Sequence, residues 1–137
     1  MSKKILVVDD DVDLVETIVQ ALSYHGFETD KAHSGKDGLQ KILSFRPDLV
    51  VLDVMMESDT AGFEVVNQLR NTKTESRFSE VSDVPVILLT AINQVTNSRF
   101  SLNEAQSFLP EISDFITKPF KIDELIARIK TISEGGA

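Results

Sequence analysis

Five polar residues of this 137-residue chain follow short apolar or β-branched runs, and their types could do chemistry together. Asp9 and Asp10 follow one run, Asp53 follows a second, Thr90 a third and Lys118 a fourth. If these runs are parallel strands, their carboxyl ends meet at one edge of a sheet, where the sites of such sheets form. The spacing therefore predicts that three carboxylates, a hydroxyl and an amine share one site.

Such a set of side chains indicates metal-assisted phosphoryl transfer. Three neighbouring carboxylates repel one another unless a cation lies among them. An all-oxygen site suits Mg²⁺, whereas zinc and copper prefer nitrogen or sulfur ligands. A lysine and a hydroxyl beside a metal-bound carboxylate can neutralise and hydrogen-bond the oxygens of a transferring phosphoryl group. The carboxylate itself can be the nucleophile, and Asp53, alone after its run, is the predicted acceptor.

Each of these residue types also has an ordinary structural explanation. A single aspartate at a strand end commonly serves in a turn or caps a helix, and we interpret Asp11 as a helix N-cap. His25 and His33 are predicted to be surface residues, and Glu57 and Asp59 to lie in a solvated acidic loop. The functional hypothesis therefore depends on the joint occurrence of the residues in this order at strand ends.

The elements that would position these residues alternate between strands and helices. Continuous β-branched runs predict buried strands, and apolar residues at helical spacing predict amphipathic helices. Strands are expected at 5–8, 27–32, 49–52, 84–89 and 115–117. Helices are expected at 12–25, from Ser34 to about 46, at 63–69 and at 122–132. This alternation predicts an α/β fold with a mostly parallel sheet that is covered on both faces.

Composition indicates one soluble, intracellular domain. Hydrophobic residues make up 42% of the chain and charged residues 26%, with a net charge of −8. Such acidity disfavours nucleic-acid binding through a basic face. No apolar run is long enough to span a bilayer, and no cysteine is present for disulfides or thiol catalysis. We expect a domain over residues 1–133 and a flexible tail over 134–137.

Four segments resemble the receiver domain of the two-component response-regulator family. They are 5–11 (ILVVDDD), 47–56 (PDLVVLDVMM), 89–91 (LTA) and 115–120 (FITKPF). The resemblance covers essentially the whole chain. It implies a flavodoxin-like (βα)5 fold, with a doubly wound, parallel, five-stranded sheet of order 2-1-3-4-5.

The resemblance also implies a role for each candidate residue. Asp53 would be the phosphoacceptor, and Asp10 and Asp53 would be direct Mg²⁺ ligands. Asp9 would act through water, and the main-chain carbonyl of Met55 would be a further ligand. Thr90 would be the family's switch hydroxyl, and Lys118 its charge-neutralising lysine. Phe115 would be the switch aromatic.

Three segments depart from the family pattern, namely a longer loop at 57–62, a polar extension at 71–83 and an atypical stretch at 92–114. The last of these leaves the surface built around the family's fourth helix unassigned. In the family, the residues two positions after the acceptor and two after the switch hydroxyl flank the path of a hydrolytic water. The resemblance places the apolar Met55 and Ile92 at these positions. They predict slow self-dephosphorylation, unless Ile92 only anchors the stretch that follows it.

The expected function is that of a stand-alone, cytoplasmic receiver that is not a conventional enzyme. It would take its phosphoryl group from a histidine kinase or a histidine phosphotransfer protein. Because the chain ends soon after its last helix, we expect either output by contact with another protein or that the sequence is part of a longer protein. Direct DNA binding and a membrane are not expected. Homodimerisation on phosphorylation stays an open alternative.

Three alternative functions agree less well with the sequence. A phosphatase of the haloacid dehalogenase type needs an acid two residues after the nucleophile, where Met55 stands. A nucleotide- or flavin-binding module lacks a glycine-rich phosphate loop, since Asp30 occupies the position of the first Walker glycine. A receiver-shaped adaptor that is never phosphorylated remains as the third.

Overall fold

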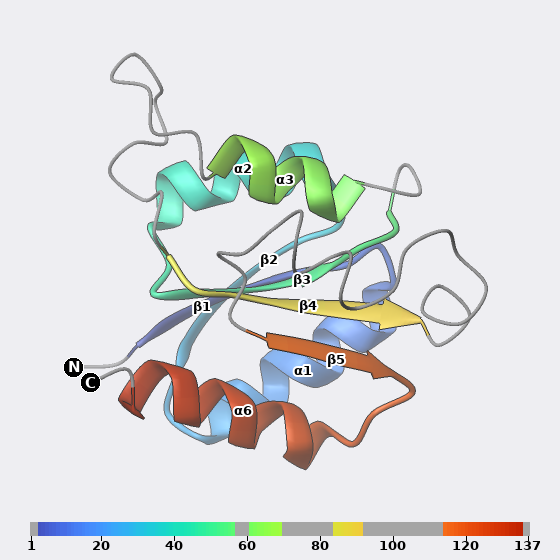
Figure 1. Ribbon diagram of the computed structural model, residues 1–137. Helices are drawn as coiled ribbons and strands as arrows, with labels where there is room; N and C mark the ends of the chain where they lie inside the picture. Colours follow the sequence, from blue (N-terminus) through green and yellow to red (C-terminus); the bar gives the residue numbers. More distant parts are fainter. Residues whose placement is uncertain (1–2, 57–60, 70–83, 92–113, 136–137) are drawn as a thin grey trace.

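Five parallel strands form one sheet in the computed structural model, which describes residues 3–56, 61–69, 84–91 and 114–135 (Figure 1). The strands are β1 (Lys4–Val8), β2 (Glu28–Ala32), β3 (Leu49–Asp53), β4 (Val86–Ala91) and β5 (Asp114–Lys118). The described helices are α1 (Val12–Tyr24), α2 (Gly35–Phe45), α3 (Ala61–Leu69) and α6 (Ile122–Gly135). The strand order is β2-β1-β3-β4-β5, which confirms the predicted parallel sheet.

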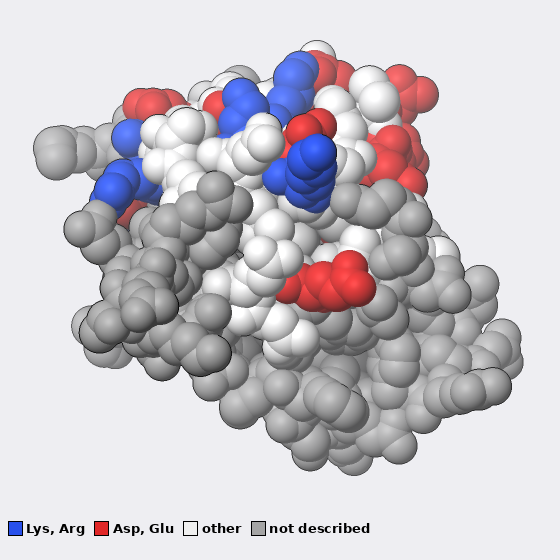
Figure 2. Space-filling view, turned by 90° about the horizontal axis from the view of Figure 1, so that it is seen from above, with Lys and Arg blue, Asp and Glu red and all other residues white. Residues whose placement is uncertain are grey.

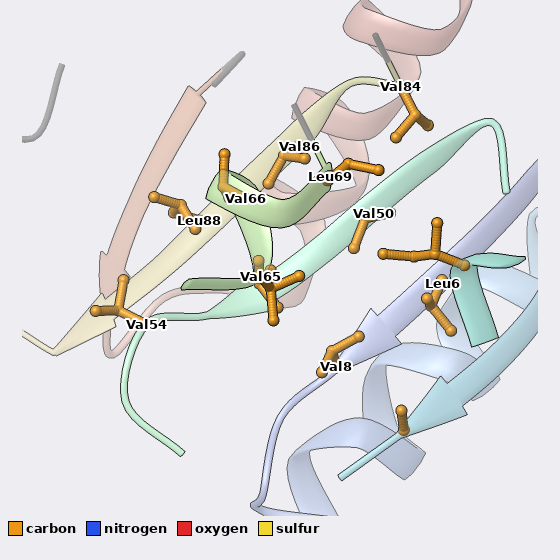
Figure 3. Close-up of a cluster of buried hydrophobic side chains, with 13 residues drawn as sticks. Leu6, Val8, Val50, Val54, Val65, Val66, Leu69, Val84, Val86 and Leu88 are labelled. Atoms are coloured by element: carbon orange, nitrogen blue, oxygen red, sulfur yellow. The ribbon is translucent and has the colours of Figure 1, made fainter. Parts of the chain in front are cut away.

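Helices cover both faces of the sheet, with α2 and α3 on one side and α1 and α6 on the other (Figure 1). Successive side chains of a strand point to opposite faces, so β1 contributes to two separate cores. Leu6 and Val8 pack toward α2 and α3 (Figure 3), whereas Ile5 and Val7 pack toward α1 and α6. All four side chains are fully buried, which is why the run is continuously apolar.

Short polar contacts set where the helices begin and end. Asp11 is the N-cap of α1, and its Oδ1 accepts a hydrogen bond from the backbone N–H of Leu14 at 3.1 Å, as the sequence predicted. Ser34 caps α2 in the same way, by accepting from the N–H of Asp37 at 3.1 Å. After α1, Gly26 has a φ of 90°, a left-handed conformation that glycine adopts without strain and that turns the chain into β2.

Element boundaries differ from the sequence expectation by one to three residues. Strand β4 begins at Val86 rather than at 84, because Pro85 has no N–H to donate to the sheet; its carbonyl accepts from Val50. The same strand continues to Ala91, so Thr90 lies inside it. Helix α6 extends to Gly135, two residues beyond the expected end of the domain at 133.

Three expectations fall partly or wholly outside the described residues. Of the loop at 57–62, only 61 and 62 are described, as the start of α3. The extension at 71–83 lies outside, as does the atypical stretch except for its last residue, Asp114, which opens β5. No described helix is long and apolar enough to cross a membrane.

The net charge of −8 does not make a uniformly acidic surface. Basic and acidic side chains lie close together on the face covered by α2 and α3 (Figure 2). Two ion pairs at the edge of the sheet join β2 to its neighbours: Lys31 contacts Glu16 of α1, and Lys41 of α2 lies 3.1 Å from Asp30. Net charge alone therefore says little about which partners this domain contacts.

Candidate functional site

The carboxyl ends of four strands bring the predicted site residues to one edge of the sheet. Asp9 directly follows β1, Asp53 is the last residue of β3, and Lys118 is the last residue of β5. Thr90 is the last but one residue of β4. The parallel register aligns these ends, since Asp53 pairs with Leu89 and Thr90 with Thr117. The structure thus gathers residues that are more than 100 positions apart in sequence.

Three carboxylates form a cluster at this edge. Oxygen atoms of Asp9, Asp10 and Asp53 all lie within 4.8 Å of one another. Asp9 is fully buried and Asp53 is 5% exposed, whereas Asp10 is exposed. Buried like charges at this separation repel strongly, so the cluster favours either a bound cation or a retained proton.

Lys118 lies between the two buried carboxylates. Its Nζ is 2.9 Å from Oδ2 of Asp9 and 3.4 Å from Oδ1 of Asp53. The other oxygen of Asp9, Oδ1, accepts a hydrogen bond from the N–H of Asp11 at 3.0 Å. Both oxygens of Asp9 therefore have partners within the protein, and one oxygen of Asp53 shares the ammonium group.

Burial and mutual repulsion shift the proton affinities of the site. Burial, followed by the charge of Asp9, raises the pKa of Asp53 to about 7 despite the opposing Lys118. Burial and the same neighbouring charge also raise the pKa of Asp10. Burial works against the charge of Lys118, but its hydrogen bond to Asp9 and its attraction to Asp53 raise its pKa overall. One ammonium group thus does not fully compensate three carboxylates.

The other predicted site residues are Thr90 of β4, Phe115 of β5 and Met55, which comes after β3. The side chain of Thr90 is 3% exposed, and Phe115 of β5 is partly buried against the core under α2 and α3. Met55 follows Asp53 by two residues, and its side chain is 39% exposed. Their expected roles as switch pair and main-chain ligand stay predictions.

A close approach of α3 fixes the main chain just after Asp53. The N–H of Gly62 donates to the carbonyl of Val54 at 2.8 Å. A Cβ atom at Gly62 would lie only 2.4 Å from the main-chain oxygen of Asp53, so only glycine fits there. The first turn of α3 is thereby held against the end of β3.

His33 contacts the site although the sequence predicted a surface position for it. His25 is exposed as expected, but His33 is half-buried, and its Nδ1 lies 3.1 Å from the main-chain oxygen of Asp9. His33 is thus still partly exposed, but the sequence did not predict its contact with Asp9. The available signal was its position directly after β2, the strand beside β1, which brings it to the same sheet edge as Asp9.

Comparison with known proteins identifies the class to which this fold and site belong. Residues 5–130 match the response regulator receiver domain family, and the chain belongs to that family. Its members accept a phosphoryl group from histidine kinases onto an aspartate in two-component systems, and they generally bind Mg²⁺ at an acidic pocket.

Individual relatives agree with this assignment. The chain is 38% identical over 132 residues to the response regulator MprA of Mycobacterium ulcerans, a match that covers 96% of this chain and 50% of MprA. The receiver domain of the Francisella response regulator 1452 superposes with a TM-score of 0.77 at 29% identity, covering 99% of this chain and all of that one. NtrX from Brucella abortus gives a TM-score of 0.76 at 28% identity, covering 98% of this chain and 27% of NtrX.

These relatives correct the prediction about partners. The chain spans about half the length of the MprA relatives that it matches and about a quarter of NtrX, so further chain accompanies the matched part in those proteins. The expectation that excluded direct DNA binding and left output to protein contact alone was therefore wrong. The acidic composition of a receiver places no limit on what a domain joined to it binds.

Proposed function

We propose that Asp53 accepts a phosphoryl group from a phosphohistidine of a partner kinase or phosphotransfer protein, in a reaction that depends on Mg²⁺. The observation that carries this proposal is the position of Lys118, whose ammonium lies between the buried carboxylates of Asp9 and Asp53. A buried carboxylate beside a cationic group, in a cluster of further oxygen donors, is suited to bind and attack a phosphoryl group.

The transfer is a displacement at phosphorus. A carboxylate oxygen of Asp53 forms the new P–O bond while the P–N bond to the partner's histidine breaks, and the imidazole takes up a proton as it leaves. The attacking oxygen must be ionised. Its raised pKa, about 7, makes ionisation incomplete near neutral pH unless further positive charge joins Lys118.

The donor set fits a hard divalent cation. Its members are carboxylate oxygens that lie within 4.8 Å of one another. Asp10 and Asp53 would hold Mg²⁺ directly, together with the main-chain carbonyl of Met55. Asp9 would act through water, because its two oxygens already accept from Asp11 and Lys118. When bound, the ion supplies charge neutralisation for these carboxylates and for the phosphoryl oxygens.

Residues of β4 and β5 would respond to the new phosphoryl group. The ammonium group of Lys118 would exchange its contact with the Asp53 carboxylate for a charge-assisted hydrogen bond to a phosphoryl oxygen. The hydroxyl of Thr90, buried one strand away, would donate to another of these oxygens, and Phe115 would repack with it. The signal would thus pass along the β4–β5 edge of the sheet.

The chain would not act as a conventional enzyme, because the phosphoryl group remains on its own side chain. Met55 supports this, since a thioether two residues after Asp53 cannot transfer the proton that a haloacid dehalogenase-type phosphatase needs there. We further propose that the domain acts in the cytoplasm, where response regulators typically meet their kinases.

Phosphorylation by a small acyl phosphate tests the proposal directly. Intact-protein mass should increase by one phosphoryl group when both acetyl phosphate and Mg²⁺ are present. Asp53→Asn should abolish the increase. Asp48→Asn, at the opposite end of β3, should leave it unchanged, since asparagine can still accept the hydrogen bond from Lys4. An undiminished increase in Asp53→Asn would refute the assignment, and no increase in the unaltered protein would favour an adaptor that is never phosphorylated.

A further inference from the structure

His33 makes a directed hydrogen bond to the backbone of the acidic cluster. The residue follows β2 and is half-buried, and its Nδ1 lies 3.1 Å from the main-chain oxygen of Asp9. A carbonyl oxygen can only accept a hydrogen bond, so Nδ1 carries the proton and donates. The contact thus specifies one nitrogen of the ring and fixes its orientation.

The end of β2 holds the main chain of Asp9 on its other side as well. The N–H of Asp9 donates to the carbonyl of Ala32 at 3.1 Å, just beyond the last paired residues of β1 and β2, Val8 and Ala32. Both main-chain polar groups of Asp9 are therefore bound by two consecutive residues, Ala32 and His33. The chain leaves the sheet from this fixed point.

The bound carbonyl controls the direction of the next residue, Asp10. The carbonyl of Asp9 and the N and Cα atoms of Asp10 lie in one rigid peptide plane. Fixing that oxygen limits rotation of the plane and so sets where the side chain of Asp10 begins. Asp10 is exposed and has little packing of its own to hold it, yet its carboxylate lies within 4.8 Å of those of Asp9 and Asp53.

We propose that His33 is a positioning residue for the acidic site, which holds the Asp9–Asp10 peptide so that the carboxylate of Asp10 is directed toward Asp53. This inference rests on the proposed function, in which Asp10 is a direct Mg²⁺ ligand. His33 would not itself be a ligand of the ion or of the phosphoryl group. It acts through the main chain and reduces the reorganisation that cation binding requires of a solvent-exposed ligand.

Three substitutions of His33 separate its hydrogen bond from its bulk. The side-chain amide nitrogen of asparagine can occupy the place of Nδ1, so His33→Asn keeps the donor. In His33→Gln the amide lies one bond farther from the backbone, and His33→Leu fills space without a donor. The exposed His25 provides the control variant, His25→Leu, at the C-terminal end of α1.

The experiment is a calorimetric titration with Mg²⁺ alone, accompanied by urea unfolding without Mg²⁺. His33→Leu and His33→Gln should weaken Mg²⁺ binding about tenfold, the lower end of the usual effect of outer-sphere partners. His33→Asn and His25→Leu should bind within about twofold of the unaltered protein, by the same scale. A purely structural role would instead make the loss of affinity follow the loss of unfolding free energy across the variants.

The remaining outcomes separate this inference from the function on which it rests. Mg²⁺ binding by the unaltered protein that is unchanged in His33→Leu would overturn the positioning role and leave the proposed function standing. Equal weakening in the Asn, Gln and Leu variants would also overturn it, because the donor would then not matter. If the unaltered protein binds no Mg²⁺, the proposed function fails and the positioning role fails with it.

Discussion

Replacing Asp53 by asparagine should stabilise the fold at neutral pH while abolishing phosphorylation. Its pKa is raised from 3.8 to about 7, so the folded protein holds the proton more tightly than the unfolded chain does. Ionisation of this carboxyl therefore opposes folding. The penalty is complete above about pH 7 and is lost as the pH falls from about 7 to about 4.

The size of the effect follows from the shift in pKa. A difference of about three units, at about 1.4 kcal/mol per unit, is an upper bound of about 4 kcal/mol. Asparagine cannot form the ion pair with Lys118, and this loss offsets part of the stabilisation. We expect Asp53→Asn to raise the free energy of unfolding by about 2 kcal/mol at about pH 7.5 without Mg²⁺, and by less than half of that at about pH 5.

Urea unfolding followed by circular dichroism measures this difference. Glu28→Gln is the control, because it removes one negative charge from an exposed position at the other end of the sheet, and its effect should stay within about 0.5 kcal/mol. Millimolar Mg²⁺ should stabilise the unaltered protein more than Asp53→Asn, since the variant lacks the negative charge of one proposed ligand. The electrostatic reasoning is refuted if Asp53→Asn is no more stable than the unaltered protein at about pH 7.5, or if its advantage does not shrink in acid.

Three further predictions concern the surroundings of the site. Asp10→Ala should lose Mg²⁺ binding in a calorimetric titration and yet unfold at no lower urea concentration, because it removes repulsion; binding equal to the unaltered protein would contradict this. Gly62→Ala should lower the free energy of unfolding by about 2 kcal/mol or more, since its Cβ would lie 2.4 Å from the main-chain oxygen of Asp53, and an unchanged urea midpoint would contradict that. Met55→Asn combined with Ile92→Glu should shorten the phosphoryl lifetime, measured by decay of the phosphorylated mass; an unchanged lifetime would show that these residues do not control hydrolysis.

Much of the fold could be predicted because buried strands and helix caps have recognisable sequence patterns. The continuous runs that became β1 and β3 are apolar because both faces of these central strands are covered. The more polar sequence of β2 fits its place at the sheet edge. Polar side chains there can be solvated or form ion pairs, as Lys31 does with Glu16. Asp11 was correctly predicted as an N-cap, because capping depends on its own side chain and the next three residues.

Features that depend on contacts between distant parts of the chain could not be predicted from local sequence patterns. Gly62 gave no periodic signal, and its importance appears only when α3 meets the end of β3. His33 likewise has a partner 24 residues away, and only the strand order, with β2 beside β1, places the two residues at the same sheet edge. The exclusion of DNA from the partners failed for a different reason, because composition describes only the chain that is present, whereas the relatives carry further chain.

The ion pair between Lys118 and Asp9 also bears on how this domain acquires its activity during folding. The two residues are 109 positions apart, so their contact closes most of the chain. Contacts of such long sequence separation form only after a large loss of chain entropy, typically when the rest of the fold is in place. A chain whose last strand has not yet joined the sheet lacks the ammonium group beside Asp53. If Asp53 and Lys118 act as proposed, competence for phosphoryl transfer should arise only with the complete sheet, and nascent or partly unfolded molecules should not signal.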